Sequence, residues 1–166
     1  LHGQRQSELI AARFYGTSGG RRQQCPLPFS MGEYAMSDDL ELARQWLEVM
    51  PEGAFDRLDG QISPQFVLRL PFAPPGVPQE FIGREVARQA LSGSAKSRSP
   101  LVFENLVLLA TEDPELFVAT ANGEATMASG KVYRNSYVIF VRIRDGKVIE
   151  HIEYMNPLNI IAAYEP

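Results

Sequence analysis

The sequence predicts an α+β fold in which two or three helices pack on one face of a mostly antiparallel sheet. Apolar residues recur at helical spacing in residues 38–50 and 83–93, with a strand-like run between them at 64–72. After residue 100, alternation with a period of two continues through four stretches separated by short turns, which is typical of an antiparallel meander. Helices that are segregated to one face of an antiparallel sheet define the α+β class.

The composition is that of one globular domain and argues against several classes of partner. The chain has 166 residues, of which 45% are hydrophobic and 22% charged, enough to bury one core. Its formal net charge of −4 argues against a nucleic acid bound through phosphates. The sequence contains no run of about 18 apolar residues, so no membrane span is predicted. Because Cys25 is the only cysteine, no internal disulfide can form, and we expect a reducing, cytoplasmic location.

Residues 1–36 differ from the rest of the chain. They are rich in Gly, Pro and polar residues and show no sustained periodicity. The chain begins with Leu1, and Met31 or Met36 would each be a natural start. We therefore interpret 1–36 as a flexible or accessory N-terminal segment and 37–166 as the folded domain.

The domain begins with a predicted helix. Ser37 is suited to cap it, Asp38 and Asp39 suit its positive N-terminal end, and Pro51 ends it. Its apolar face consists of Leu40, Ala43, Trp46, Leu47 and Met50. A short helix is predicted at 52–60. The helix predicted at 83–93 has an apolar face made of Val86, Ala87, Ala90 and Leu91.

The predicted strands follow from alternation. In the run at 64–72, one side consists of Phe66, Leu68, Leu70 and Phe72. The Pro-rich stretch 73–78 after it is predicted as a rigid loop. Four more strands are predicted at 101–110, 116–127, 131–143 and 147–155. Gly123 is a candidate β-bulge in the second of them.

Residues 144–146 leave two registers open for the last hairpin. A two-residue turn pairs Arg144 with Lys147 and places Val138 opposite Glu153. Because a shift of one residue turns every side chain to the other face, the choice decides which residues share a side.

We favour the other register, in which a three-residue loop pairs Ile143 with Lys147. The resulting opposite pairs are Tyr137 with Glu153 and Ile139 with His151. One face of the hairpin then carries Asn135, Tyr137, Ile139, Val141, Ile149, His151, Glu153 and Met155.

Polar side chains gather at one end of that apolar face, and a pocket for a small molecule needs such a combination. Glu153 is the leading candidate, because a carboxylate with little hydration can take and return a proton near neutral pH. His151 would share a proton with Glu153 or orient it, and Tyr137 and Asn135 would donate to a substrate oxygen. Glu124, on the preceding strand, is a second carboxylate that would point inward.

The sequence lacks the motifs of phosphate, metal and cysteine chemistry. The stretch GTSGGRR has neither the Lys-Ser/Thr ending nor the preceding strand of a phosphate-binding loop. The two histidines, His2 and His151, do not predict a His-rich metal site, and Cys25 has no plausible base beside it. We therefore expect neither a metal nor a cofactor.

Three stretches resemble a known superfamily. PFAPPGVPQEFIGREVARQAL, VLLATEDPELFVA and YRNSYVIFVRIRDGKVIEHIEYMNP look like the SnoaL-like group of the nuclear transport factor 2-like superfamily. They are most similar to the phenazine biosynthesis A/B proteins, which share a Tyr-x-Asn strand, an Asp-Gly-Lys turn and a Glu-Tyr-Met-Asn ending. The resemblance spans Ser37 to Tyr164. It implies a cone-shaped, strongly curved, mostly antiparallel sheet with two to three helices covering its concave face.

The resemblance also implies roles for residues. Glu153 matches the carboxylate that acts as acid/base in the phenazine proteins, and Tyr133 and Asn135 match their Tyr-x-Asn residues. Those proteins carry a pocket histidine where this chain has Ala90, so a phenazine-type condensation does not follow from the resemblance. The predicted catalytic residues are Glu153 and His151. The predicted substrate-binding residues are Tyr137, Asn135, Tyr133, Glu124, Trp46 and Met155.

The resemblance and the polar cluster together favour a small-molecule enzyme. It would be a cofactor-independent isomerase, cyclase, hydratase or hydrolase that acts on an apolar, oxygenated metabolite, in the manner of secondary metabolism. The alternative is a non-catalytic ligand-binding or dimeric interaction module, since this fold hosts both. Many members of the superfamily are dimers through the outer sheet face, so we predict a homodimer. The predicted interface consists of Ser136, Val138, Phe140, Arg142, Val148, Glu150, Ile152 and Tyr154.

Overall fold

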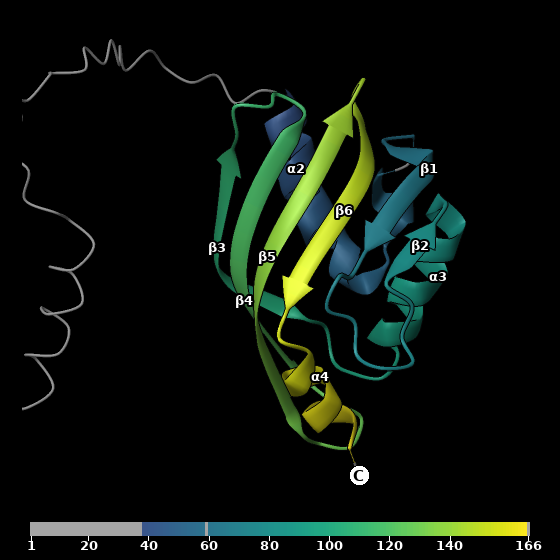
Figure 1. Ribbon diagram of the computed structural model, residues 1–166, viewed down its shortest axis with the longest axis vertical. Coiled ribbons are helices and arrows are strands. Elements are labelled where there is room, and N and C mark those ends of the chain that lie inside the picture. Colours follow the sequence, from purple (N-terminus) through teal and green to yellow (C-terminus); the bar gives the residue numbers. More distant parts are fainter. Residues whose placement is uncertain (1–37, 59, 166) are drawn as a thin grey trace, which may run out of the picture. The chain divides into compact units, whose positions relative to one another are not determined.

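The computed structural model describes residues 38–58 and 60–165, and their fold is the α+β class that the sequence predicts. This part of the chain forms an open, mostly antiparallel sheet of six strands, with α-helices packed against its concave face (Figure 1). The expected N-terminal segment 1–36 and the capping role of Ser37 lie outside the described residues.

The strand order of the sheet is β2-β1-β6-β5-β4-β3. The strands are β1 (Ile62–Arg69), β2 (Glu80–Ile82), β3 (Val102–Ala110), β4 (Leu116–Thr126), β5 (Val132–Arg144) and β6 (Lys147–Met155). The β1–β6 pair is parallel and every other neighbouring pair is antiparallel. The short edge strand β2 was not predicted; it pairs with the end of β1 across the Pro-rich loop.

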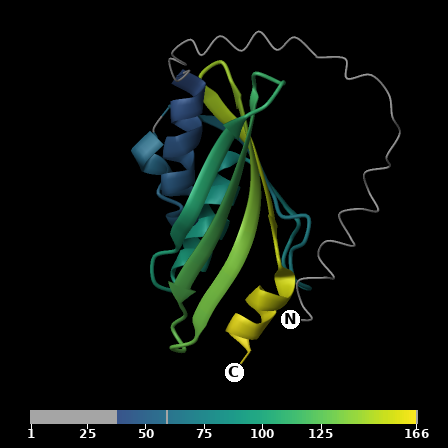
Figure 2. The same cartoon turned by 90° about the vertical axis from the view of Figure 1, so that its left-hand side faces the viewer.

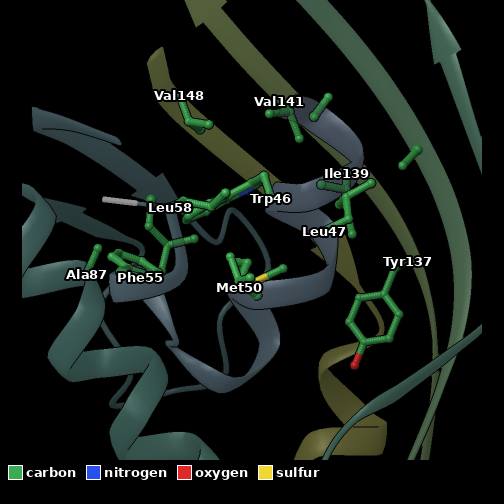
Figure 3. Close-up of a cluster of buried hydrophobic side chains, with 14 of the residues drawn as sticks. Trp46, Leu47, Met50, Phe55, Leu58, Ala87, Tyr137, Ile139, Val141 and Val148 are labelled. Carbon is green, nitrogen blue, oxygen red and sulfur yellow. The ribbon is translucent and has the colours of Figure 1, made fainter. Parts of the chain in front are cut away.

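The two longer helices cover the concave face (Figure 2). They are α2 (Asp38–Val49) and α3 (Arg84–Ala95). The predicted helix at 52–60 is shorter, because two 3₁₀ turns follow α2 instead, η1 (Met50–Glu52) and η2 (Phe55–Leu58). This path keeps Trp46, Leu47 and Met50 against the inner face of the sheet (Figure 3).

A further helix, α4 (Pro157–Tyr164), was not predicted. It follows β6 directly and packs against β5 at one end of the sheet (Figure 1). Asn156 caps it, because its side-chain oxygen accepts a hydrogen bond from the backbone of Leu158 at 3.0 Å. Pro157 occupies the first turn, where its fixed φ suits the helix and its missing N–H costs nothing.

The last hairpin turns on two residues, so the favoured three-residue loop was wrong. Arg144 pairs with Lys147, and both residues between them have positive φ, 51° for Asp145 and 66° for Gly146. Aspartate tolerates that conformation and glycine adopts it freely, which makes Asp-Gly a common two-residue hairpin turn.

A bulge next to the turn changes the pairing again. Ile143 pairs with Val148 but Arg142 pairs with Glu150, which leaves Ile149 as the extra residue. His151 therefore lies opposite Val141, and Glu153 lies opposite Ile139. Neither of the two registers considered gave these partners.

The bulge has one favourable consequence and one that contradicts the sequence prediction. It returns Asn135, Tyr137, His151 and Glu153 to one side of the hairpin, as expected. Val148, however, was predicted for the outer face and is fully buried in the inner one. It packs in the cluster that includes Trp46, Ile139 and Val141 (Figure 3).

Gly123 does not form a bulge. It pairs regularly with Asn135 on β5 and with Phe103 on β3, and the bulge of this strand pair lies in β3 between Glu104 and Val107. Gly123 instead makes room for an aromatic ring, since a Cβ there would lie 2.6 Å from Cε2 of Tyr137. The absence of a side chain at 123 therefore leaves the space that the Tyr137 ring occupies.

Candidate functional site

A cavity of about 710 Å³ lies between the concave face of the sheet and the elements around it. Its size is within the range of small-molecule sites. Most of its wall is apolar, and the wall comes from β1, β5, β6, α3, α4 and the loop before β2. The apolar wall includes Leu68, Leu70, Phe81, Leu91, Leu101, Met127, Met155, Ile160 and Ile161.

Glu153 provides a carboxylate in this apolar wall. It lies on β6 and its side chain is 12% exposed. Oε2 lies 3.4 Å from Nε2 of His151, whereas Oε1 has no hydrogen-bond partner among the described residues. No side-chain oxygen of this part of the chain is both fully buried and unpaired. Oε1 is therefore the accessible oxygen, available to a ligand in the cavity.

His151 lies behind Glu153 and does not line the cavity. Its ring is 0% exposed, and Nδ1 accepts a hydrogen bond from the indole Nε1–H of Trp46 at 3.0 Å. Trp46 reaches it from α2, where it packs against Phe55 and Phe66 at ring-centroid distances of 5.0 Å. The expectation that Trp46 contacts the ligand is not supported, because Trp46 is fully buried in the core beneath the cavity.

Two tyrosines on β5 form the second polar group of the cavity. The hydroxyl oxygens of Tyr133 and Tyr137 lie 2.7 Å apart, and Nδ2 of Asn135 donates to the Tyr133 oxygen at 3.0 Å. In Figure 3 the Tyr137 hydroxyl points away from the hydrophobic cluster. The hydrogen bond between the tyrosines uses one of their two hydroxyl protons. The other proton has no acceptor among the described residues and can be donated to a ligand.

Burial keeps both tyrosines protonated. It raises the pKa of Tyr137 strongly, and the neighbouring Tyr133 and the Glu153 carboxylate raise it further. Burial also raises the pKa of Tyr133, although the hydrogen bonds from Tyr137 and Asn135 oppose that shift. The pair therefore acts as a hydrogen-bond donor over the whole physiological range.

Asn135 organises this end of the sheet and does not line the cavity. Its Oδ1 accepts from the backbone N–H groups of Ser136 and Asn156, both at 3.0 Å. Its Nδ2 donates to Tyr133 and to the carbonyl of Asn156. Both amide hydrogens are thus committed inside the protein, so the expected donation from Asn135 to a substrate is not supported.

Arg98 is a cavity residue that the sequence did not indicate. Its side chain is 7% exposed, and Nη1 donates to Glu52 Oε1 and to the carbonyl of Ser99, both at 3.0 Å. The backbone N–H of Leu101 donates to the same Glu52 oxygen at 2.9 Å. These contacts attach the 96–101 loop to η1 and place a neutralised cation in the cavity wall.

Glu124 does not point inward. It is exposed on the outer face of β4, where its carboxylate lies 2.7 Å from Nε of Arg134. The strand alternates regularly there, so a residue next to the inward-facing Gly123 faces outward. Of the eight residues expected in the site, Glu153, Tyr137, Tyr133 and Met155 line the cavity. Trp46, His151 and Asn135 lie behind them.

Other wall residues were also missed. Ile160, Ile161 and Tyr164 belong to the unpredicted α4, and Pro74, Pro75 and Val77 belong to the loop before β2. Asn156-Pro157 was a usable helix-start signal for α4. Ala90 of α3, where the resemblance places a histidine in the phenazine proteins, lines the cavity, and so does Ser94 of the same helix. Within 38–58 and 60–165, no cluster of three His, Cys, Asp or Glu side chains is arranged to hold a metal ion.

The comparisons with known proteins agree with this fold. A family model described as the SnoaL-like domain matches residues 43–151. This chain belongs to the SnoaL-like domain family. Its fold is accordingly that of the nuclear transport factor 2-like superfamily. Among the described residues of this SnoaL-like protein, no helix is both long and apolar enough to cross a membrane.

Individual relatives place it near the phenazine A/B proteins. An uncharacterized PhzA/B-like protein of Pseudomonas aeruginosa is 31% identical over 102 residues, which is 60% of this chain and 71% of the relative. A Bacillus subtilis structure with a provisional isomerase assignment matches at a TM-score of 0.67 and 22% identity, covering 76% of this chain and 92% of that one. The phenazine biosynthesis-related protein phzb2 of P. aeruginosa matches at a TM-score of 0.63 and 17% identity, covering 82% and 88%. At these identities the two structures show a shared fold.

Proposed function

We propose that this SnoaL-like protein is a cofactor-independent acid/base enzyme that acts on an apolar, oxygenated metabolite. One observation carries the proposal. A carboxylate with a free oxygen, Glu153 Oε1, and a tyrosine pair with a free hydroxyl proton line the same apolar cavity. A proton acceptor and a neutral hydrogen-bond donor in one apolar pocket are the two groups that an enolisation needs.

The chemistry follows from these two groups. The tyrosine hydroxyl whose proton is free donates a hydrogen bond to a substrate carbonyl oxygen. The Glu153 carboxylate removes a proton from the carbon next to that carbonyl, and the C–H electron pair moves into an enolate. The tyrosine donor stabilises the charge that develops on oxygen. Return of the proton to another carbon gives an isomer. Attack of the enolate carbon on a second carbonyl of the same molecule closes a ring, and the alkoxide formed there takes the proton back from Glu153.

The apolar wall supports an apolar substrate. Apart from Ser94, Glu153, Glu165, Arg98 and the tyrosines, the wall consists of apolar side chains. Arg98 is already paired with Glu52, whereas Glu153 and Glu165 are wall carboxylates for which the described residues provide no Lys or Arg partner. The cavity therefore favours a neutral ligand over an anionic one. The fold shared with the provisionally assigned Bacillus subtilis isomerase is compatible with this chemistry, but the proposal rests on the cavity.

The test is proton exchange with a simple substrate analogue. The purified protein is incubated with 2-tetralone in D₂O, and deuterium incorporation next to the carbonyl is followed by NMR. We expect exchange that is saturable and is lowered about 100-fold or more in Glu153→Gln, since positioned acid/base groups contribute roughly 10²–10⁴-fold. In parallel, binding of 2-naphthol, whose hydroxyl occupies the enolate position, is followed by its fluorescence.

The two assays separate an enzyme from a binding module. Exchange that is lost in Glu153→Gln, together with 2-naphthol binding that is retained, supports the proposal. Tight 2-naphthol binding without exchange in the wild type refutes it and favours the non-catalytic module. Arg134→Gln is the matched control, because Arg134 is an exposed charge on the outer face, and this variant should exchange like the wild type.

A further inference from the structure

Three side chains from two distant parts of the chain form a continuous hydrogen-bonded row. Trp46 on α2 donates from Nε1 to Nδ1 of His151 at 3.0 Å, and Nε2 of His151 lies 3.4 Å from Oε2 of Glu153. Trp46 and His151 are both 0% exposed. Only Glu153, the last member of the row, lines the cavity.

The first member of the row decides the protonation of the second. An indole N–H can donate a hydrogen bond and cannot accept one. Nδ1 of His151 must therefore present its lone pair to Trp46. The single proton of a neutral imidazole then lies on Nε2, the nitrogen that faces Glu153. A proton on Nδ1, whether in the other tautomer or in an imidazolium ion, would place two N–H donors against each other in a site that water does not reach.

The second member in turn decides the orientation of the third. With its proton on Nε2, His151 donates to Oε2 of Glu153. That bond holds one carboxylate oxygen against the sheet and leaves Oε1 facing the cavity. Because His151 is neutral in this arrangement, it presents a dipole and not a cation to the Glu153 carboxylate.

We propose that Trp46 is a positioning residue that fixes His151 in its neutral Nε2–H tautomer, so that His151 serves as a fixed donor to Glu153 and carries no proton itself. The assignment rests on the proposed function for its purpose, because it presumes that Glu153 is the base. It changes the expected role of His151, which sequence reasoning had grouped with Glu153 as a catalytic residue.

The fixed tautomer can be tested without any substrate. Trp46 is the only tryptophan of the chain, so protein labelled with ¹⁵N in tryptophan and histidine gives one indole signal. Long-range ¹H–¹⁵N spectra report the tautomer of each imidazole, and His2→Gln identifies the signals of His151. We expect the Nε2–H pattern for His151 at neutral pH and a scalar coupling across the Trp46 Nε1–H···Nδ1 bond. An Nδ1–H or imidazolium pattern, or a missing coupling, overturns the proposal.

Removing the indole N–H of Trp46 tests whether this group sets the tautomer of His151. Replacing Trp46 by β-(3-benzothienyl)alanine exchanges the indole N–H for sulfur and keeps the shape of the side chain, so the core stays packed. Tryptophan auxotrophs permit this replacement at a single site here. We expect the coupling to be lost and the His151 ring to become a mixture of tautomers. A pure Nε2–H ring in this protein would show that Trp46 does not set the tautomer.

Two substitutions distinguish a fixed donor from a proton carrier. In His151→Gln, the side-chain amide can accept from Trp46 and donate to Glu153 but cannot carry a proton at neutral pH. His151→Leu removes both bonds at similar volume. We expect 2-tetralone exchange within about tenfold of the wild type for His151→Gln and a loss of about 100-fold for His151→Leu. A loss of about 100-fold or more in His151→Gln, with 2-naphthol binding intact, would make His151 a proton carrier and overturn the proposal.

The two proposals can fail separately. If wild-type protein shows no exchange while the spectra show the Nε2–H ring and the coupling, the proposed enzyme function fails and the tautomer assignment stands. If exchange occurs but the His151 ring carries its proton on Nδ1, the proposed function stands and the role of Trp46 falls.

Discussion

The substitution Gly123→Ala tests how the sheet positions the tyrosine pair. A Cβ at 123 would lie 2.6 Å from Cε2 of Tyr137 and 3.1 Å from Cδ1 of Leu101. Ordinary carbon contacts begin near about 3.5 Å, so the ring has to retreat by about 1 Å. A shift of that size takes the Tyr137 hydroxyl out of hydrogen-bond range of Tyr133, from which it is now 2.7 Å away.

The expected cost combines three effects. Overpacking a buried site costs about 1–3 kcal/mol, and loss of the tyrosine–tyrosine hydrogen bond adds about 1 kcal/mol. Replacing Gly by Ala lowers the entropy of the unfolded chain, which returns about 0.4–1 kcal/mol. We therefore expect Gly123→Ala to lower the free energy of unfolding by about 1–3 kcal/mol and to weaken 2-naphthol binding.

Urea unfolding at neutral pH measures the first effect, with Gly93→Ala as the matched control. Gly93 lies in α3, and no neighbouring atom comes within 4 Å of the position that an alanine methyl group would take there, so alanine should stabilise the protein by about 1 kcal/mol. In the double variant Gly123→Ala/Tyr137→Leu the clash is relieved. Its loss of unfolding free energy should therefore be smaller than the sum of the losses in the two single variants. A Gly123→Ala protein as stable as the wild type would refute the packing argument.

Four further outcomes are expected. Glu153→Gln should unfold within about 1 kcal/mol of the wild type, because an amide oxygen can still accept from His151; a loss of several kcal/mol in urea would mark Glu153 as a structural charge. Because burial raises the pKa of Tyr137, the unfolded chain loses the phenol proton at a lower pH than the folded protein, and stability should fall as pH rises above about 10. In Tyr137→Phe, stability should fall less steeply over this range. The same slope in both proteins would contradict the prediction. The hydrogen bond from Arg142 lowers the pKa of Asp113, so the ionised Asp113 stabilises the fold above its unfolded-state pKa, and this stabilisation is lost as pH falls through its folded-state pKa. In Asp113→Asn, the free energy of unfolding should therefore fall less steeply between pH 5 and 2. An unchanged slope would count against the ion pair. The predicted homodimer should sediment at twice the monomer mass at micromolar concentration and dissociate in Val138→Glu, an exposed outer-face position; a monomer in both proteins would remove the prediction.

Elements with strong periodicity could be predicted from the sequence, and their exact pairing could not. Strands β3 to β6 and helices α2 and α3 form where the alternation and the helical spacing predict them. The predicted apolar face of α3 is confirmed only in part, because Ala87 is buried but Val86 is 50% exposed. The hairpin register failed because it depends on two local features at once. The turn at Asp145-Gly146 was one of the two considered, but the bulge at Ile149 leaves no mark in an apolar, β-branched run. Val148 and Ile149 have the same strand preference, and tertiary packing decides which one faces the core.

The candidate site shows the same limit. Glu153 and the tyrosines were found because they stand out as polar groups on an apolar face. Trp46 was expected on the right face of its helix, but its role depends on a partner 105 residues away, and no local pattern encodes such a contact. Arg98 lies in an irregular loop, where neither period nor motif indicates that its guanidinium is buried. Long-range pairs of this kind become visible only once the chain is folded.

The cavity wall has a consequence for how ligand preference can change. The groups proposed for chemistry all lie on β5 and β6, whereas much of the apolar lining comes from α4 and the loop before β2. Both of these elements follow the ends of strands and take no part in strand pairing. Their side chains can therefore vary in size without disturbing the hydrogen bonds of the sheet. Laboratory selection at positions such as Val77 and Ile161 can therefore change which molecules fit the cavity, while Glu153 and the tyrosine pair keep their positions.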